Sequence, residues 1–165
     1  MRTAARALSG LAAVTTLVGN GIATGLPPAI PAACDLLSSS MAREFAGTDA
    51  ERQLWLDADP PVPLGDSACQ YSGSAGTVFV SLNPMPTNPD APINHFSVVR
   101  PENAIPDLGY QAYWFGAGQS LVVVKEGLLL QIKVSDNANP AGAQPDQDHK
   151  NRDIALANQI VPELS

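Results

Sequence analysis

Alternating hydrophobic and polar residues predict strands in the middle of the chain. In residues 77–82, Val78, Val80 and Leu82 occupy every second position, which is the spacing of a half-buried strand. Residues 69–71 open a preceding strand, and the SGSAG stretch between the two runs is rich in turn-forming residues. Together the two runs predict a β-hairpin.

A second hairpin is predicted further along the chain. Residues 120–124 and 128–134 are aliphatic or β-branched runs, and KEG at 125–127 joins them with a glycine suited to the left-handed conformation. The second run does not simply alternate, because Leu129 is as apolar as its neighbours. We therefore expect its start to be covered on both faces, at the centre of a sheet. The other short apolar runs that predict strands are 53–56 and 95–99.

Helical patterns flank this strand-rich region. Ser38 is a good N-cap for a helix in which Met41 and Phe45 share one face, and Gly47 is a suitable stop. A last helix is expected over 146–161, and the proline that follows should end or kink it. The apolar side of this last helix is predicted to consist of Ile154, Ala157, Ile160, Val161 and Leu164.

The order of helix, strands and helix predicts an α+β fold. We expect a single antiparallel sheet of about 4–6 strands, with an N-terminal and a C-terminal helix packed against it. Segment 83–92 contains four prolines and can form neither a helix nor a central strand. It is predicted to be a stiff excursion on the surface.

The N-terminus is typical of an export signal. Arg2 and Arg6 precede an apolar run at 7–18, and small residues follow it. The run is shorter than the roughly 20 residues that span a membrane, so no transmembrane segment is expected in the mature chain. A buried helix of a cytosolic protein is the other reading. The predicted organisation is a signal peptide at 1–25, a short proline-rich linker at 26–33 and one domain at 34–165.

The chain is acidic, with a formal net charge of −7 at pH 7. Removal of a signal peptide with its two arginines would make this −9, and the remaining lysines and arginines are dispersed. Such a surface has no electrostatic attraction for nucleic acid and little for an anionic membrane. We expect an exported, monomeric protein that binds no nucleic acid.

Cys34 and Cys69 are the only cysteines, and Cys34 has three possible roles. A lipid anchor fits poorly, because Pro31 stands where the lipidation motif has an aliphatic residue. A reactive thiol fits least, since there is no CxxC motif and both histidines are distant in sequence. Two cysteines in an exported chain favour one disulfide. It would close a loop of about 35 residues and restrict the unfolded chain by roughly 4 kcal/mol.

Three stretches of the chain stand in a characteristic order: CDLLSSSMAREF, then CQYSGSAGTVFVSL, then GYQAYWFGAGQSLVVVKEGLLLQIKV with DIALANQIV. This order resembles a family of small exported actinobacterial domains of unknown function, many of them lipoproteins, over most of residues 34–164. The resemblance implies a Cys34–Cys69 disulfide and a secreted or envelope location. It carries over no catalytic residue. The chain differs from the lipoprotein members in having no separate upstream cysteine for acylation.

No group of residues completes a catalytic or metal-binding motif. Ser67 stands in GDSAC, which is similar to the surroundings of a serine-protease nucleophile, but the following glycines and an upstream histidine are missing. Asp57 with Asp59, and Asp146 with Asp148, are carboxylate pairs in polar stretches, where equal solvation gives equal acidity. We therefore expect solvated loops there, and no catalytic residue, metal site or cofactor.

The candidate binding site is the aromatic group Tyr110, Tyr113, Trp114 and Phe115. Strand alternation puts Tyr113 and Phe115 on one face, and Trp114 on the other with Ala112. Core packing is the simpler interpretation of this group; an apolar groove or partner-binding patch is the functional one.

The sequence favours a non-catalytic binding or accessory module for an envelope component. The first alternative is a carrier of a small apolar ligand in a groove near residues 113–115. A hydrolase without a recognisable motif is the third possibility.

Overall fold

The fold is known from a computed structural model that describes residues 30–56, 60–85, 99–137 and 147–164. The predicted signal peptide, residues 26–29 of the predicted linker and the predicted strand at 95–99, apart from Val99, lie outside the described residues.

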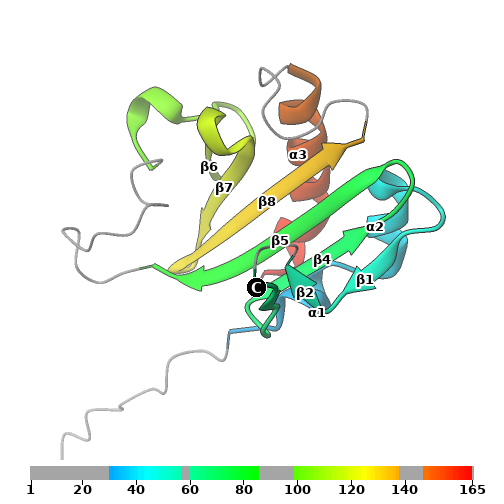
Figure 1. Cartoon of the computed structure of the whole chain (residues 1–165). Coiled ribbons are helices and arrows are strands. Elements are labelled where there is room, and N and C mark those ends of the chain that lie inside the picture. The colour runs from blue at the N-terminus through cyan, green and yellow to red at the C-terminus, as the bar shows by residue number, and fades with distance from the viewer. Residues whose placement is uncertain (1–29, 57–59, 86–98, 138–146, 165) are drawn as a thin grey trace, which may run out of the picture.

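A six-stranded antiparallel sheet forms the centre of the fold (Figure 1). Its spatial order is β1-β4-β5-β8-β7-β6. In that order the strands are β1 (Glu51–Gln53), β4 (Ala68–Ser72), β5 (Gly76–Pro84), β8 (Leu128–Asp136), β7 (Ser120–Lys125) and β6 (Gln111–Phe115). The predicted α+β class with one main antiparallel sheet is confirmed.

A second, two-stranded sheet was not predicted. The expected strand at 53–56 divides at Leu54, so that Gln53 ends β1 and β2 (Trp55–Leu56) begins a separate pair with β3 (Val62–Pro63). Prolines in and before β3 limit it to this short pairing, because proline has no N–H group to donate to the hydrogen bonds of a longer strand pair. We call β2 and β3 together the β2–β3 arm.

The two predicted hairpins form the middle of the main sheet. β4 pairs with β5, and β8 lies between β5 and β7, as its unbroken apolar start predicts. Leu129 and Leu130, which point to opposite faces, are both buried. At the β7–β8 turn, Glu126 (φ 51°) and Gly127 (φ 77°) both adopt the left-handed conformation.

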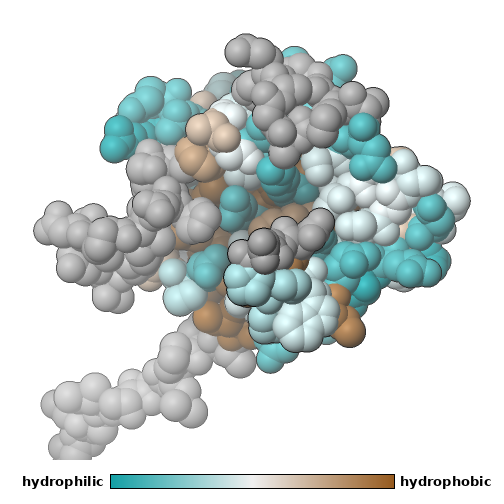
Figure 2. Space-filling model, in the orientation of Figure 1, coloured by the Kyte–Doolittle hydropathy of each residue, from teal (hydrophilic) through white to brown (hydrophobic). Residues whose placement is uncertain are grey.

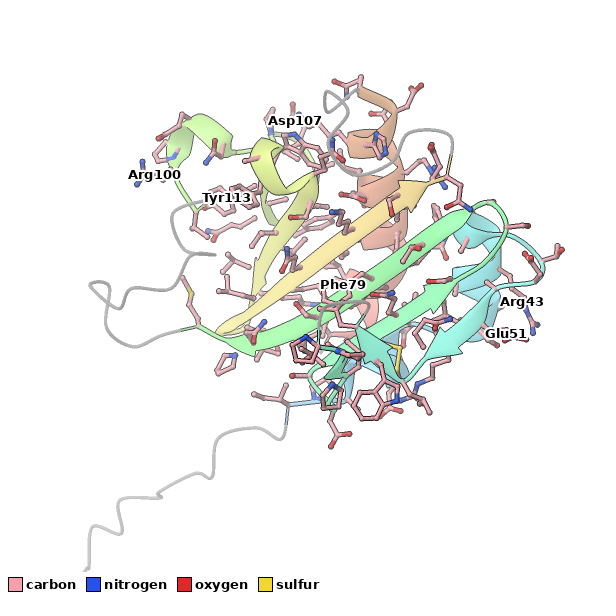
Figure 3. The ribbon with its side chains drawn as sticks, viewed as in Figure 1. Arg43, Glu51, Phe79, Arg100, Asp107 and Tyr113 are labelled. Carbon is pink, nitrogen blue, oxygen red and sulfur yellow. A yellow bond between two sulfur atoms is a disulfide. The ribbon has the colours of Figure 1, made fainter. Side chains whose placement is uncertain are left out.

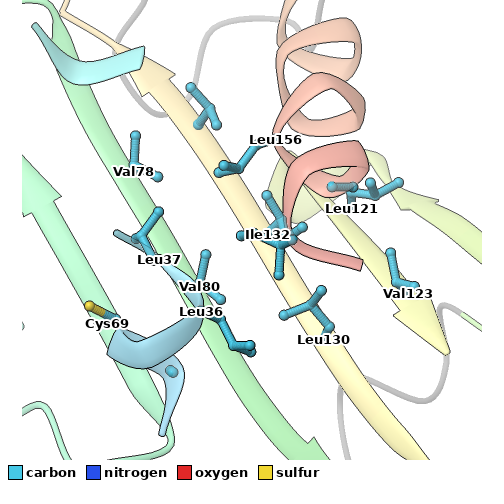
Figure 4. Packing of buried hydrophobic residues seen from close by; sticks show 14 of the residues in the cluster. Leu36, Leu37, Cys69, Val78, Val80, Leu121, Val123, Leu130, Ile132 and Leu156 are labelled. Carbon is cyan, nitrogen blue, oxygen red and sulfur yellow. The ribbon is translucent and has the colours of Figure 1, made fainter. Parts of the chain in front are cut away.

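The α-helices of the described residues all cover the same face of the sheet (Figures 1 and 4). They are α1 (Ala33–Leu36), α2 (Ser39–Ala46) and α3 (Gln147–Ile160). The described residues also form the short 3-10 turns η2 (Pro101–Asn103), η3 (Gly116–Gly118) and η4 (Val161–Glu163). The end of α3 and the turn that contains Pro162 agree with the sequence.

A short helix that was not predicted, α1, precedes the expected N-terminal helix, α2. The predicted boundaries hold for α2: the Ser38 hydroxyl accepts a hydrogen bond from the Met41 N–H (3.2 Å), and Gly47 (φ 106°) ends the helix. α1 precedes it, and the Cys34–Cys69 disulfide joins α1 to β4, with the two Cα atoms 5.0 Å apart. The predicted disulfide is therefore present.

The hydrophobic core lies between the helices and the sheet (Figure 4). α1 contributes Leu36 and α3 contributes Leu156, and both pack over the alternating aliphatic residues of β5 and β8. The sheet residues of this core include Val78, Val80, Leu82, Leu121, Val123, Leu130, Ile132 and Val134. Burial of this layer supplies the main hydrophobic stabilisation of the domain.

A buried carboxylate on α3 was missed by the sequence analysis. Asp153 is fully buried, and its Oδ1 accepts a hydrogen bond from the Val134 N–H at 2.6 Å. The Leu121 N–H also donates to it. Burial raises the pKa of Asp153 to about 8, against the opposing effect of these hydrogen bonds. Asp153 therefore holds α3 against the start of β7. The residue directly before this strand, Gln119, has a left-handed backbone (φ 47°).

Candidate functional site

The face of the main sheet opposite the helices is here called the open face. Its composition changes from polar on β1, β4 and β5 to apolar on β7 and β6. One row across four paired strands consists of Gln53, Gln70, Phe79 and Lys133. The neighbouring row contains Ser72, Thr77 and Ser135. Figure 3 shows Phe79 in the middle of this face and Tyr113 toward β6.

A groove lies between the polar part of the open face and the β2–β3 arm. Its volume is about 870 Å³, within the roughly 300–1,000 Å³ of typical ligand sites. Trp55, Leu56 and Pro61 form its apolar side. Its floor consists of Gln53, Gln70, Ser72 and Thr77. Figure 2 shows hydrophilic and hydrophobic residues mixed on this side of the molecule.

A smaller hollow of about 320 Å³ continues the groove across the sheet. It shares Leu56, Gln70 and Thr77 with the groove, so the two spaces adjoin. Beyond these shared residues it is lined by Phe79, Gly118, Gln131, Lys133 and Ser135. We call the groove and the hollow together the open-face groove.

Several polar groups of the open-face groove are available to a ligand. The hydroxyls of Ser72 and Thr77 contact each other at 3.3 Å, and the Gln131 amide donates to the buried Ser120 hydroxyl at 3.1 Å. By contrast, the half-buried side chains of Gln70 and Lys133 make no hydrogen bond or ion pair with any residue in the described part of the chain. Such groups are paired by solvent or by a ligand.

The β2–β3 arm exposes an unusual amount of apolar surface. Trp55 is 57% exposed and Val62 49%, and Leu54, directly before the arm, is 66% exposed. The Leu64 N–H donates to the Leu54 carbonyl (3.0 Å), which closes the base of the arm. A cluster of large exposed hydrophobic side chains beside a groove is typical of a binding surface.

The predicted aromatic group is divided between the two faces of the sheet, as the alternation of β6 requires. Trp114 packs against the main core, whereas Tyr113 and Phe115 pack with Val122 on the open face. The Tyr110 hydroxyl donates to Asn158 Oδ1 of α3 at 2.8 Å, and burial raises the pKa of Tyr110. None of the four aromatic residues lines either space of the open-face groove. A ligand site at these residues stays a prediction.

The candidate catalytic residues do not come together. Ser67 is exposed in the turn before β4, and Asp148 lies in the first turn of α3. Asp57, Asp59 and Asp146 lie outside the described residues. Across residues 30–56, 60–85, 99–137 and 147–164, no cluster of three or more His, Cys, Asp or Glu could hold a metal ion.

The open-face groove was not found by sequence reasoning, although its signal is present. WL at 55–56 is an apolar pair directly before the proline-rich stretch DADPPVP, which prevents a long buried strand. Such a pair has to stay near the surface. Which polar residues it faces depends on strand register, which cannot be read from local sequence.

No helix within the described ranges is long and apolar enough to cross a membrane. Comparisons with family models, with curated proteins and with solved structures found no match to this chain.

Proposed function

We propose that the chain is an exported, non-catalytic binding module that acts at or outside the cell envelope and holds its partner on the open face of its sheet. The observation that carries this proposal is the open-face groove, which is lined by the exposed Trp55 and by the Gln70 amide, for which the described residues offer no hydrogen-bond partner. The main hydrophobic core does not include either residue, because it lies on the other face of the sheet.

The disulfide supports the proposed location. Disulfides form and persist in oxidising compartments, outside the cytoplasm in most organisms. The signal-peptide pattern at 1–25 and the resemblance to exported actinobacterial domains point in the same direction.

Expression of the full chain in an actinobacterial host tests export. We expect intact-mass measurement of the secreted protein to show loss of the signal peptide and the two-hydrogen deficit of a disulfide. Retention of the uncut chain in the cytoplasm would contradict the proposed location. The added mass of an acyl chain on Cys34 would show that this cysteine carries a lipid anchor and forms no disulfide.

Co-sedimentation with the insoluble envelope fraction of that host tests binding. We expect Trp55→Ala to weaken retention by about tenfold. Met85→Ala is the matched control, because Met85 is also an exposed apolar residue (38%) but does not line the open-face groove. Equal retention of both variants would contradict a role for this face.

A carrier of a small apolar ligand is the second candidate function. The observation in its favour is the apolar end of the open face, where Tyr113 and Phe115 pack with Val122 and Leu129. A carrier function predicts that Phe115→Ala abolishes binding of a fatty-acid probe and that Trp55→Ala does not. The binding module predicts the reverse dependence on these two residues for its own partner.

A further inference from the structure

The open-face groove has an uncommon combination of side chains, and this combination indicates the class of its ligand. Its floor carries amides and hydroxyls, which both donate and accept hydrogen bonds. Its walls carry Trp55 at the arm and Phe79 further across the sheet. Lys133 is the charged residue among the described lining residues, and no carboxylate lines either space there.

Two ligand classes fit this combination poorly. A wholly apolar ligand would bury the Gln70 amide and the floor hydroxyls without partners, which costs free energy. A cationic ligand would find no described carboxylate to pair with and would approach Lys133. The ligand therefore needs apolar surface and many hydroxyl-like groups, and Lys133 suits a neutral or acidic one.

Sugar rings have both properties. Their C–H faces are apolar and pack on aromatic rings, while their hydroxyls donate and accept hydrogen bonds in the plane of the ring. Trp55 is 57% exposed and already lines the groove, so its ring face is accessible without rearrangement of the core.

The shape of the groove favours a chain of sugars over a single ring. The lining residues run from β1 through β4 and β5 to β8, which is three strand spacings or roughly 14 Å. Trp55 and Phe79 lie on different elements along this path, with Gln70 paired directly beside Phe79. Two aromatic contacts separated by amides suit successive rings of an oligosaccharide.

We propose that the open-face groove binds a linear oligosaccharide, with rings packed on Trp55 and Phe79 and hydroxyls bonded to Gln70, Ser72 and Thr77. Lys133 lies at the far end, where it receives an acidic substituent when the glycan carries one. This inference rests on the proposed function and specifies the envelope component that the module recognises.

Isothermal titration of the full-length secreted protein tests the inference. The probes are chitohexaose, cellohexaose, maltohexaose and hexagalacturonate, with a proline-rich decapeptide as a competing ligand class. We expect at least one hexasaccharide to bind with a Kd of roughly 1 mM or lower. Trp55→Ala and Gln70→Ala should each weaken that binding by about tenfold or more, and Met85→Ala should leave it unchanged.

The outcomes separate this inference from the proposed function. Absence of binding by every hexasaccharide at about 5 mM overturns the inference, and so does binding that Trp55→Ala does not weaken. If the peptide binds in a manner that depends on Trp55 and no sugar binds, the inference is overturned, but the proposed function of the open face as a binding surface stands. Binding of hexagalacturonate alone supports the inference if Lys133→Gln weakens it. Circular dichroism of each variant excludes loss of the fold as the cause.

Discussion

The two faces of the main sheet are built from alternate residues of the same strands, yet they differ in kind. On the helix-covered face, neighbouring positions such as Val78, Val80 and Ile132 are aliphatic and have no exposed surface. On the open face, their immediate neighbours Thr77, Phe79 and Lys133 are polar or aromatic and half-buried. Over β4, β5 and β8, one face thus meets the need for burial and the other is free to recognise a ligand. Only the β6–β7 end of the open face carries a buried cluster of its own, around Val122 and Leu129.

The difference matters because folding and binding place different demands on a residue. A core position tolerates only side chains that fill its volume, whereas an open position needs no particular side chain for stability. Polar side chains that gather beside exposed aromatic and aliphatic residues are therefore evidence of recognition. Four changes test this division, in order of the effect expected.

Removal of the disulfide should have the largest effect, because it joins α1 covalently to β4 of the sheet. We expect the double variant Cys34→Ala, Cys69→Ala to lose about 4 kcal/mol of unfolding free energy, from the greater freedom of its unfolded chain. Urea unfolding followed by circular dichroism measures it. A loss below about 1 kcal/mol would show that the helix layer is held without the covalent link.

A matched pair of substitutions on β8 compares the faces directly. Ile132→Ala leaves a cavity under α3 and should destabilise the protein by about 3 kcal/mol. Lys133→Ala, one residue along and on the open face, should change stability by no more than about 0.5 kcal/mol. Urea unfolding measures both changes. Similar losses of unfolding free energy from the two substitutions would contradict the proposed difference between the two faces.

Asp153, on the covered face, makes the stability of the protein depend on pH. Its pKa is about 8 in the folded protein and near 3.8 in the unfolded chain, so between these values the folded state holds a proton that the unfolded state has lost. Stability therefore falls as pH rises through this window, by roughly 1 kcal/mol per pH unit.

Asp153→Asn removes the titrating group and keeps an oxygen that can accept from the Val134 N–H. Urea unfolding at several pH values should show a shallower decline for this variant than for the wild type. Parallel curves for the two proteins would mean that Asp153 is ionised in the folded state.

The smallest effect distinguishes two amides of the open face. Gln131→Ala leaves the buried Ser120 hydroxyl without its 3.1 Å donor and should cost about 1 kcal/mol. Gln70→Ala removes an amide that has no partner among the described residues, so the free energy of unfolding should change by no more than about 0.5 kcal/mol. A larger loss from Gln70→Ala than from Gln131→Ala would assign Gln70 a structural role.

Local sequence patterns predicted the elements well and their assembly less well. The alternation of 77–82, the KEG turn and the Ser38 cap act over a few residues, so their outcomes follow from local chemistry. The division of 53–56 at Leu54 depends on where β1 stops pairing with β4, which is a property of the whole sheet.

Burial of polar residues was the main feature that the sequence could not supply. Asp153 and His149 lie one turn apart on α3 and are both buried, although their side chains suggest a solvated helix face. The partners of Asp153 are backbone N–H groups on β7 and β8, and these come close only in the folded chain. The open-face groove likewise combines residues from β1, β2, β4, β5 and β8.

The two tryptophans provide the most direct test of the open face as the binding surface, because Trp55 lies in the groove and Trp114 packs against the core. Single-tryptophan variants, Trp114→Phe and Trp55→Phe, allow each to be followed by acrylamide quenching with and without the envelope fraction. We predict that bound material shields Trp55 and leaves Trp114 unchanged. Shielding of Trp114 while Trp55 stays fully quenchable would contradict the account and move the site to β6.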